Sequence, residues 1–136
     1  MGEIIIHSDG AARGNPGPAG AGAVLTDPEG KVVGEVCMYL GDDMTNNQAE
    51  YRALILALRE AEGKGATSLS IFADSELMVR QIKGEYKVKN EGMKVLHAEA
   101  VQLLRKFGRY SISYIPREKN KRADKLANLA IDGQML

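Results

Sequence analysis

The chain has 136 residues, of which 44% are hydrophobic and 26% charged, and this size and composition fit one domain, over residues 1–136, with a substantial buried core. Its one cysteine excludes an internal disulfide and indicates a reducing compartment. No stretch approaches the roughly 20 apolar residues that span a bilayer, and the first residues lack a signal-peptide pattern. We therefore expect a soluble, cytoplasmic protein.

The formal net charge is zero, but the charges are unevenly distributed. Residues 65–136 carry thirteen basic and eight acidic side chains, whereas residues 1–64 carry five and ten. The basic side chains cluster within residues 80–94 and 117–125. On charge alone, a solvated surface and a phosphate-binding surface are equally supported, so zero net charge does not exclude a polyanionic partner.

The first forty residues predict three strands, at 3–8, 20–26 and 31–40. The turn sequence Asp27-Pro-Glu-Gly joins the last two in an antiparallel hairpin. Asp9 ends the first apolar run, and the glycines and prolines that follow it predict a loop. Cys37 lies in the third strand, where we expect a packed thiol.

Later elements alternate between helix and strand. Helical periodicity covers residues 47–62, a strand follows at 68–73, and a short helix begins after Ser75. Asn90 can cap the next helix, whose apolar stripe, more typical of a core than of a partner surface, is Met93, Leu96, Ala100, Leu103 and Phe107. A strand at 110–115 stops at Pro116, and a last helix covers 121–131. This order predicts an α/β fold with a mixed sheet, whose later strands are parallel and covered by helices.

Four carboxylates, Asp9, Glu50, Asp74 and Asp124, lie at the edges of these predicted elements. Such sheets bind ligands beyond the carboxyl ends of their parallel strands, so we expect these side chains to meet there. For any single acid a helix cap or a surface charge is the better explanation, because acids favour first turns. Their joint placement instead predicts one Mg²⁺ or Mn²⁺ site, since hard cations prefer oxygen ligands.

Two cations about 4 Å apart can activate water and stabilise the departing oxygen of a phosphodiester. The only histidines are His7 and His97, and no glycine-rich nucleotide-binding loop is present. Hydrolysis through a covalent intermediate is therefore poorly supported.

Four motifs resemble type 1 ribonuclease H in order and spacing, over essentially the whole chain. They are SDGAARGNPGPAGAG at residues 8–22, TNNQAEY at 45–51, ADS at 73–75 and NKRADKLA at 120–127. The resemblance implies the ribonuclease H-like fold, a five-stranded sheet of order 3-2-1-4-5 with its second strand antiparallel. It also implies a metal-dependent endoribonuclease that hydrolyses the RNA strand of RNA/DNA hybrids and leaves 5′-phosphate and 3′-hydroxyl ends.

The resemblance also implies roles for individual residues. Asp9 matches the carboxylate that bridges two ions, and Asp124 a ligand of the ion that activates water. Glu50 and Asp74 match ligands of the other ion, and Glu50 also matches the residue that contacts a ribose 2′-hydroxyl. Amides and hydroxyls suit groove and phosphate contacts, and the residues expected at the nucleic acid are Asn15, Thr45, Asn47, Gln48, Ser75 and Tyr86.

The chain departs from many relatives in two places. It lacks the basic handle and every tryptophan, and Tyr86 lies near the position of a tryptophan that meets the DNA strand. The loop before Asp124 is short and lacks the usual histidine, so we expect Arg117 or Glu118 to serve in its place. The chain is thus similar to the form of the family without handle or loop histidine.

Two alternatives stay open. A broader nuclease would also cut double-stranded RNA, because A-form shape is partly shared. A catalytically silent nucleic-acid-binding module would reuse the same fold, although retention of all four acids argues against it. Integrases and resolvases share the fold but have different acid spacing. We expect a monomer without membrane contact.

Overall fold

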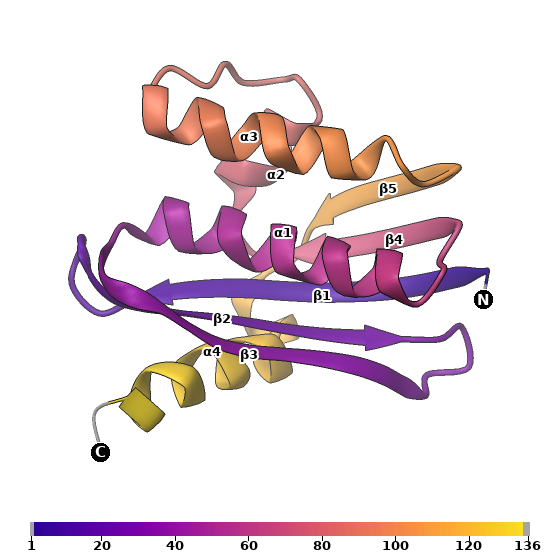
Figure 1. Ribbon diagram of the computed structural model, residues 1–136, viewed down its shortest axis with the longest axis horizontal. Helices are drawn as coiled ribbons and strands as arrows, with labels where there is room; N and C mark the ends of the chain where they lie inside the picture. Colours follow the sequence, from indigo (N-terminus) through magenta and orange to yellow (C-terminus); the bar gives the residue numbers. More distant parts are fainter. Residues whose placement is uncertain (1, 135–136) are drawn as a thin grey trace.

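The computed structural model describes residues 2–134 and contains one five-stranded sheet of order β3-β2-β1-β4-β5 (Figure 1). β2 pairs antiparallel with β1 and β3, whereas β4 pairs parallel with β1 and β5. The strands are β1 (Glu3–Ala12), β2 (Gly17–Thr26), β3 (Val32–Met44), β4 (Ser68–Ala73) and β5 (Arg109–Tyr114). The predicted strand order and the antiparallel second strand are confirmed.

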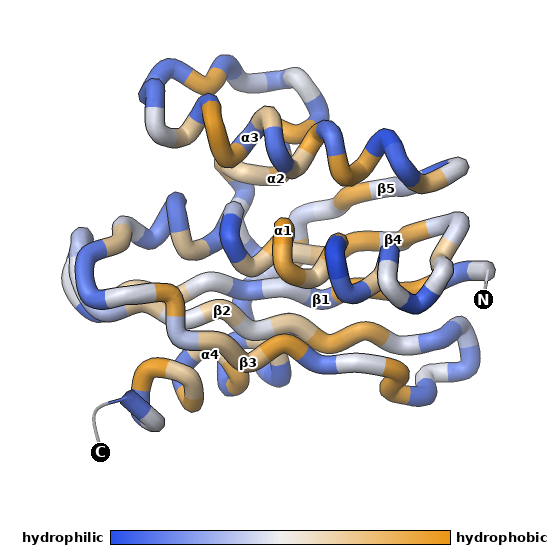
Figure 2. The backbone as a smooth tube through the Cα atoms, in the orientation of Figure 1, coloured by the Kyte–Doolittle hydropathy of each residue, from blue (hydrophilic) through white to orange (hydrophobic). Residues whose placement is uncertain are grey.

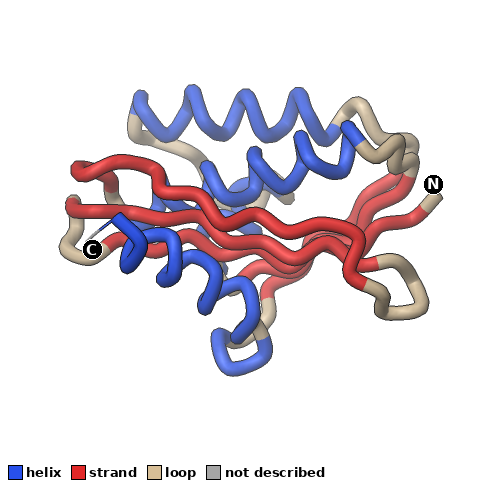
Figure 3. Tube along the Cα trace, turned by 60° about the horizontal axis from the view of Figure 1, so that its bottom comes forward, coloured by secondary structure: helices blue, strands red, loops and turns tan. Residues whose placement is uncertain are grey.

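The helices lie on both faces of the sheet. α1 packs on one face, with residues of α2 and α3 in the same core, and α4 packs on the other; the turned view shows helices on both sides of the strands (Figure 3). The helical elements are α1 (Asn46–Gly63), α2 (Glu76–Ile82), α3 (Glu91–Leu104), the short 3₁₀ helix η1 (Arg117–Lys119) and α4 (Lys121–Gln134). Across residues 2–134, none of them combines the length and apolar character needed to cross a bilayer.

The main core lies between the sheet and α1, and hydrophobic segments concentrate on these strands and helices (Figure 2). Ile4 and Ile6 alternate along β1 and are fully buried, as are Leu54 and Leu58 on α1. The spacing of two residues in β1 is that of one face of a strand, and the spacing of four residues in α1 is that of one face of a helix. The predicted apolar stripe is confirmed as core, with Ala100 and Leu103 of α3 buried and Met93 and Leu96 packed against the core. Phe107 is also buried, but it lies beyond α3, which ends at Leu104.

Three glycines allow helices to approach the sheet closely. A Cβ on Gly22 of β2 would lie 2.2 Å from the backbone oxygen of Ala123 in α4. A Cβ on Gly10 of β1 would lie 2.1 Å from the backbone carbon of Ala49 in α1, and Gly20 is similarly enclosed by α4. Because only glycine fits at such distances, these residues set how closely α1 approaches β1 and how closely α4 approaches β2.

The predicted end of the first strand at Ser8 was wrong. β1 continues to Ala12, because its small residues pair antiparallel with β2 as far as Ala12 opposite Ala19. Asp9 therefore lies inside β1, opposite Gly22. The parallel pairing of β1 with β4 ends at Ser8 and Ala73, so Asp9 and Asp74 both follow its last pair.

The predicted hairpin turn is confirmed, but the predicted packing of the Cys37 thiol is wrong. Asp27 accepts hydrogen bonds from the amides of Glu29 and Lys31 and closes the turn between β2 and β3. Cys37 is exposed, because β3 is an edge strand and residue 37 lies on its α4 side. Its Sγ donates to the backbone oxygen of Leu126 at 3.2 Å.

Candidate metal centre

Three carboxylates converge at the end of the parallel β1–β4 pair. One oxygen from each of Asp9, Glu50 and Asp74 lies within 4.8 Å of the other two. Asp9 comes from β1, Glu50 from the second turn of α1, and Asp74 follows β4 directly. They line a cavity of about 210 Å³, whose wall also includes Gly10, Ala11, Asn46, Arg117 and Asp124.

The electrostatics of this cluster favour a bound cation. Burial raises the pKa of Asp9, and the charges of Glu50 and Asp74 raise it further. Burial and the charge of Asp74 also raise the pKa of Glu50, although Glu50 accepts a hydrogen bond of 3.1 Å from the Gly10 amide. Carboxylates held this close repel one another, so a divalent cation with oxygen ligands would relieve the repulsion.

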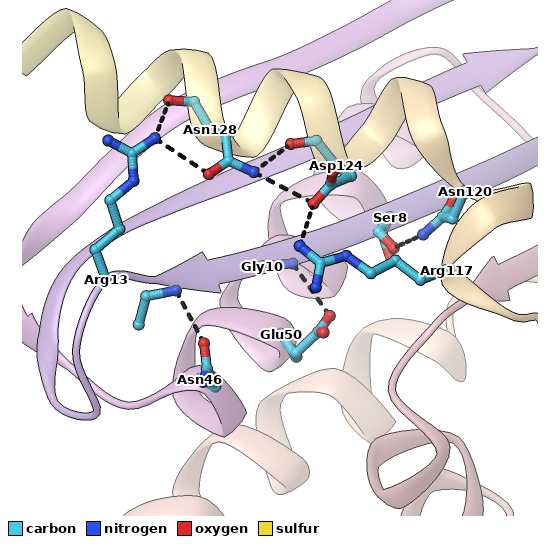
Figure 4. A network of polar contacts seen from close by, with 10 residues as sticks. Ser8, Gly10, Arg13, Asn46, Glu50, Arg117, Asn120, Asp124 and Asn128 are labelled. Atoms are coloured by element: carbon cyan, nitrogen blue, oxygen red, sulfur yellow. Dashed lines mark hydrogen bonds and ion pairs between the residues drawn. The ribbon is translucent and has the colours of Figure 1, made fainter.

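Asp124 comes from α4 and lines the same cavity as the other three acids. A hydrogen bond between the carboxyl groups of Asp9 and Asp124 contributes to the raised pKa of Asp9. Asp124 Oδ1 also accepts a hydrogen bond of 3.2 Å from Arg117 Nη2 (Figure 4). All four predicted acids thus line one cavity, and Asp9 interacts with each of the other three.

The loop before Asp124 contributes Arg117 but not Glu118 to the cavity wall. Arg117 extends from η1 with 74% of its side chain exposed and pairs with Asp124. The carboxylates of Asp124, and more weakly those of Asp9 and Asp74, raise the pKa of Arg117. Glu118 is exposed and lies outside the lining of this cavity.

The predicted nucleic-acid contacts fall into two groups. Thr45 and Gln48 form a capping box at the start of α1, and the Ser75 side chain caps α2. Asn15 accepts a hydrogen bond of 3.0 Å from the Asn46 amide. Two residues are instead exposed: Asn47, whose side chain makes no hydrogen bond within residues 2–134, and Tyr86, whose ring lies 5.4 Å from the Arg80 guanidinium carbon.

Three asparagines near the site were missed from the sequence. Asn46 lines the acidic cavity and accepts from the Ala12 amide at 3.0 Å, and it lies within the recognised TNNQAEY motif. Asn128 donates a hydrogen bond to Asp124. The spacing of four residues on one predicted helix is a signal in the sequence for this contact. Asn120, the first residue of the recognised NKRADKLA motif, is buried and donates to the Ser8 backbone oxygen at 2.9 Å, a contact across 112 residues.

The sheet order and the acidic cavity define the ribonuclease H-like class of α/β proteins. A family model described as reverse transcriptase-like matches residues 7–130. Ribonuclease HI of Halobacterium salinarum is 41% identical over 96% of this chain and 65% of its own length. A bifunctional protein of Mycobacterium tuberculosis is 43% identical over 96% of this chain and 36% of its own length.

Solved structures agree with these sequence matches. The crystal structure of RNase H1 from Halobacterium salinarum has a TM-score of 0.93 at 40% identity, covering 96% of this chain and 98% of that one. LC11-RNase H1, solved in complex with an RNA/DNA hybrid, has a TM-score of 0.92 at 43% identity, covering 98% and 99%. The chain belongs to the type 1 ribonuclease H family. It spans about a third of the mycobacterial relative and about two thirds of the halobacterial one.

Proposed function

We propose that this protein is a metal-dependent endoribonuclease that hydrolyses the RNA strand of RNA/DNA hybrids, leaving 5′-phosphate and 3′-hydroxyl ends. The observation that carries the proposal is the meeting of Asp9, Glu50, Asp74 and Asp124 at one cavity of a ribonuclease H-like fold. The hybrid bound to LC11-RNase H1, a relative of the same fold, supports this substrate class.

The donor set fits two Mg²⁺ or Mn²⁺ ions. Asp9 interacts with Asp124 and also with Glu50 and Asp74, which suits a carboxylate shared by two cations. Asp124 would then be a ligand of one ion, and Glu50 and Asp74 of the other. When bound, such cations supply an activated water and stabilise the departing oxygen.

The residues around the cavity position the substrate. The Gly10 amide donates a hydrogen bond of 3.1 Å to the Glu50 carboxylate. In this position the carboxylate would contact a ribose 2′-hydroxyl. Asn15 and Asn47 flank the start of α1 and would contact the groove of the hybrid, where the 2′-hydroxyl distinguishes RNA from DNA. Thr45 and Ser75 would seat phosphate oxygens, and the exposed Tyr86 would meet the DNA strand.

One assay tests the function. Matched RNA/DNA, RNA/RNA, DNA/DNA and single-stranded RNA substrates are incubated with Mg²⁺, Mn²⁺ or a chelator, and the product ends are mapped. We expect cleavage of the RNA strand of the hybrid only, abolished by chelator. Equal cleavage of RNA/RNA would make the enzyme a broader nuclease, and hybrid binding without cleavage would make it a silent binding module.

Light scattering tests the accompanying expectation of a monomeric single domain, and cell fractionation tests its cytoplasmic location.

Substitution of the amides by alanine separates substrate contacts from structural ones. We expect Asn47→Ala to raise KM for the hybrid with unchanged thermal stability, because its side chain has no hydrogen bond to lose within residues 2–134. Gln48→Ala and Asn15→Ala should raise KM and also lower Tm, because each removes a hydrogen bond near the start of α1. Separate titrations with Mn²⁺ and with hybrid check this. A large loss of Mn²⁺ affinity with normal hybrid affinity would contradict it.

Arg117→Ala should lower kcat more than it raises KM. Its guanidinium lies at the cavity beside Asp124 and can contact the scissile or departing phosphate, but it cannot act as a base near neutral pH. Glu118→Ala is the matched control, since Glu118 lies outside the cavity wall. Steady-state kinetics from pH 6 to 9 measure both variants. Parental kcat and KM for Arg117→Ala would make the loop a simple connector.

A further inference from the structure

The side-chain amide of Asn128 joins Asp124 to the loop between β1 and β2 (Figure 4). Its Nδ2 donates to Asp124 twice, to the backbone oxygen at 3.0 Å and to carboxylate Oδ1 at 3.2 Å. Its Oδ1 accepts a hydrogen bond of 3.2 Å from Arg13 Nη2. The two contacts use both ends of one amide.

Arg13 decides which way this amide faces. A guanidinium only donates hydrogen bonds, so the oxygen of Asn128 must face Arg13 and the nitrogen must face Asp124. Arg13 is itself held on α4 by an ion pair of 2.5 Å with Asp132. The donor that meets the Asp124 carboxylate is therefore oriented from outside the acidic cluster.

Asp124 needs such support because its other hydrogen-bond donor is an exposed side chain. Arg117 also donates to Asp124 Oδ1, but 74% of the Arg117 side chain is exposed and it extends from the short helix η1. Asn128 is half-buried and lies one turn after Asp124 on α4. An amide on the same helix restricts rotation of the carboxylate more strongly than an exposed guanidinium from a separate short helix does.

We propose that Asn128 is a positioning residue, which directs the Asp124 carboxylate toward Asp9 and so toward the cations. The inference rests on the proposed function, because it assigns Asn128 to the same metal centre. Hydrogen-bond partners that orient metal-binding carboxylates commonly matter by 10- to 100-fold in metal affinity or activity. The contact with Arg13 also ties this carboxylate to the loop that carries Asn15, which in turn accepts from the start of α1.

The test compares Asn128→Leu, which keeps the size of the side chain but removes its donor, with the parent protein. Leu129→Ala is the matched control, because Leu129 is exposed on the same helix and lies outside the wall of the acidic cavity. Calorimetric titration with Mn²⁺ alone, in the absence of nucleic acid, gives the metal affinity. Hybrid cleavage kinetics and Tm are then measured for the same preparations.

We expect Asn128→Leu to bind Mn²⁺ at least about 10-fold more weakly and to lose kcat by a similar factor, with KM for the hybrid nearly unchanged. The control should retain the parental Mn²⁺ affinity. A lowered Tm with parental Mn²⁺ affinity and kcat would overturn the inference and make Asn128 a purely structural residue. Should Asn128→Leu fail to fold, Asn128→Ala is measured against the same criteria.

The two proposals fail in different ways. A parent protein that binds no Mn²⁺ overturns both of them. A parent that binds Mn²⁺ and cleaves hybrid, but whose Asn128 variants do the same, overturns the role of Asn128 alone. A parent that binds Mn²⁺ without cleaving hybrid overturns the enzymatic proposal, and the titration of the variants still decides the role of Asn128.

Discussion

Asp9→Asn should reduce hybrid cleavage by at least about 10³-fold, because it removes the charge expected to hold both cations together. Asp9 is 4% exposed and interacts with Glu50, Asp74 and Asp124, so we expect no neighbouring carboxylate to take its place. Hybrid binding should persist. Single-turnover cleavage at saturating Mg²⁺ measures the loss, and activity within tenfold of the parent would refute the bridging role.

The same substitution should stabilise the metal-free protein. Burial and neighbouring charges raise the pKa of Asp9 above its ordinary value of 3.8. The unfolded chain therefore releases this proton at lower pH than the folded protein does, and the free energy of unfolding falls as pH rises above about 4. We expect the Asn variant to lack this part of the pH dependence.

Urea unfolding in chelator at several pH values checks the stability prediction. The difference in unfolding free energy between Asp9→Asn and the parent should increase from pH 4 to pH 8. Added Mn²⁺ should reduce or reverse it, because the cation stabilises only the folded parent strongly. A difference in unfolding free energy that decreases with rising pH would show that folding does not raise the pKa of Asp9.

Gly10→Ala should destabilise the protein by about 3 kcal/mol or more, since overpacking against rigid backbone is among the costliest substitutions. The new Cβ would lie 2.1 Å from the Ala49 carbonyl carbon and 2.4 Å from the Glu50 amide nitrogen. These backbone atoms belong to α1, so the helix has to move away from β1. Glu50 would then lose its hydrogen bond from the Gly10 amide, and activity should fall together with stability.

Gly63→Ala is the control for this prediction. Gly63 ends α1, and a Cβ there meets nothing within 4 Å. The same chemical change should therefore be neutral or stabilise by about 0.4–1 kcal/mol, through a less flexible unfolded chain. Chemical denaturation of both variants measures the contrast, and equal stabilities would show that α1 can shift away from β1 without cost.

Much of the fold could be predicted because its signals are local. The period of two in Ile4 and Ile6, the Asp27 turn and the cap at Asn90 involve residues within a few positions of one another. The four carboxylates could be assigned because they lie in motifs whose order and spacing resemble a known family. Propensity and motif alone thus determined the strand order, the helices and the four acids.

Contacts between distant segments could be decided only by the tertiary structure. The extension of β1 to Ala12 depends on pairing with β2, and the exposure of Cys37 depends on β3 being an edge strand. The bond from Arg13 to Asn128 joins residues 115 positions apart, so no periodicity could indicate it. Arg117 rather than Glu118 faces the cavity for the same reason. The sequence by itself determined which elements form and which acids share one cavity. Packing decided the directions of the side chains, because close approach and hydrogen-bond direction exist only once the helices pack on the sheet.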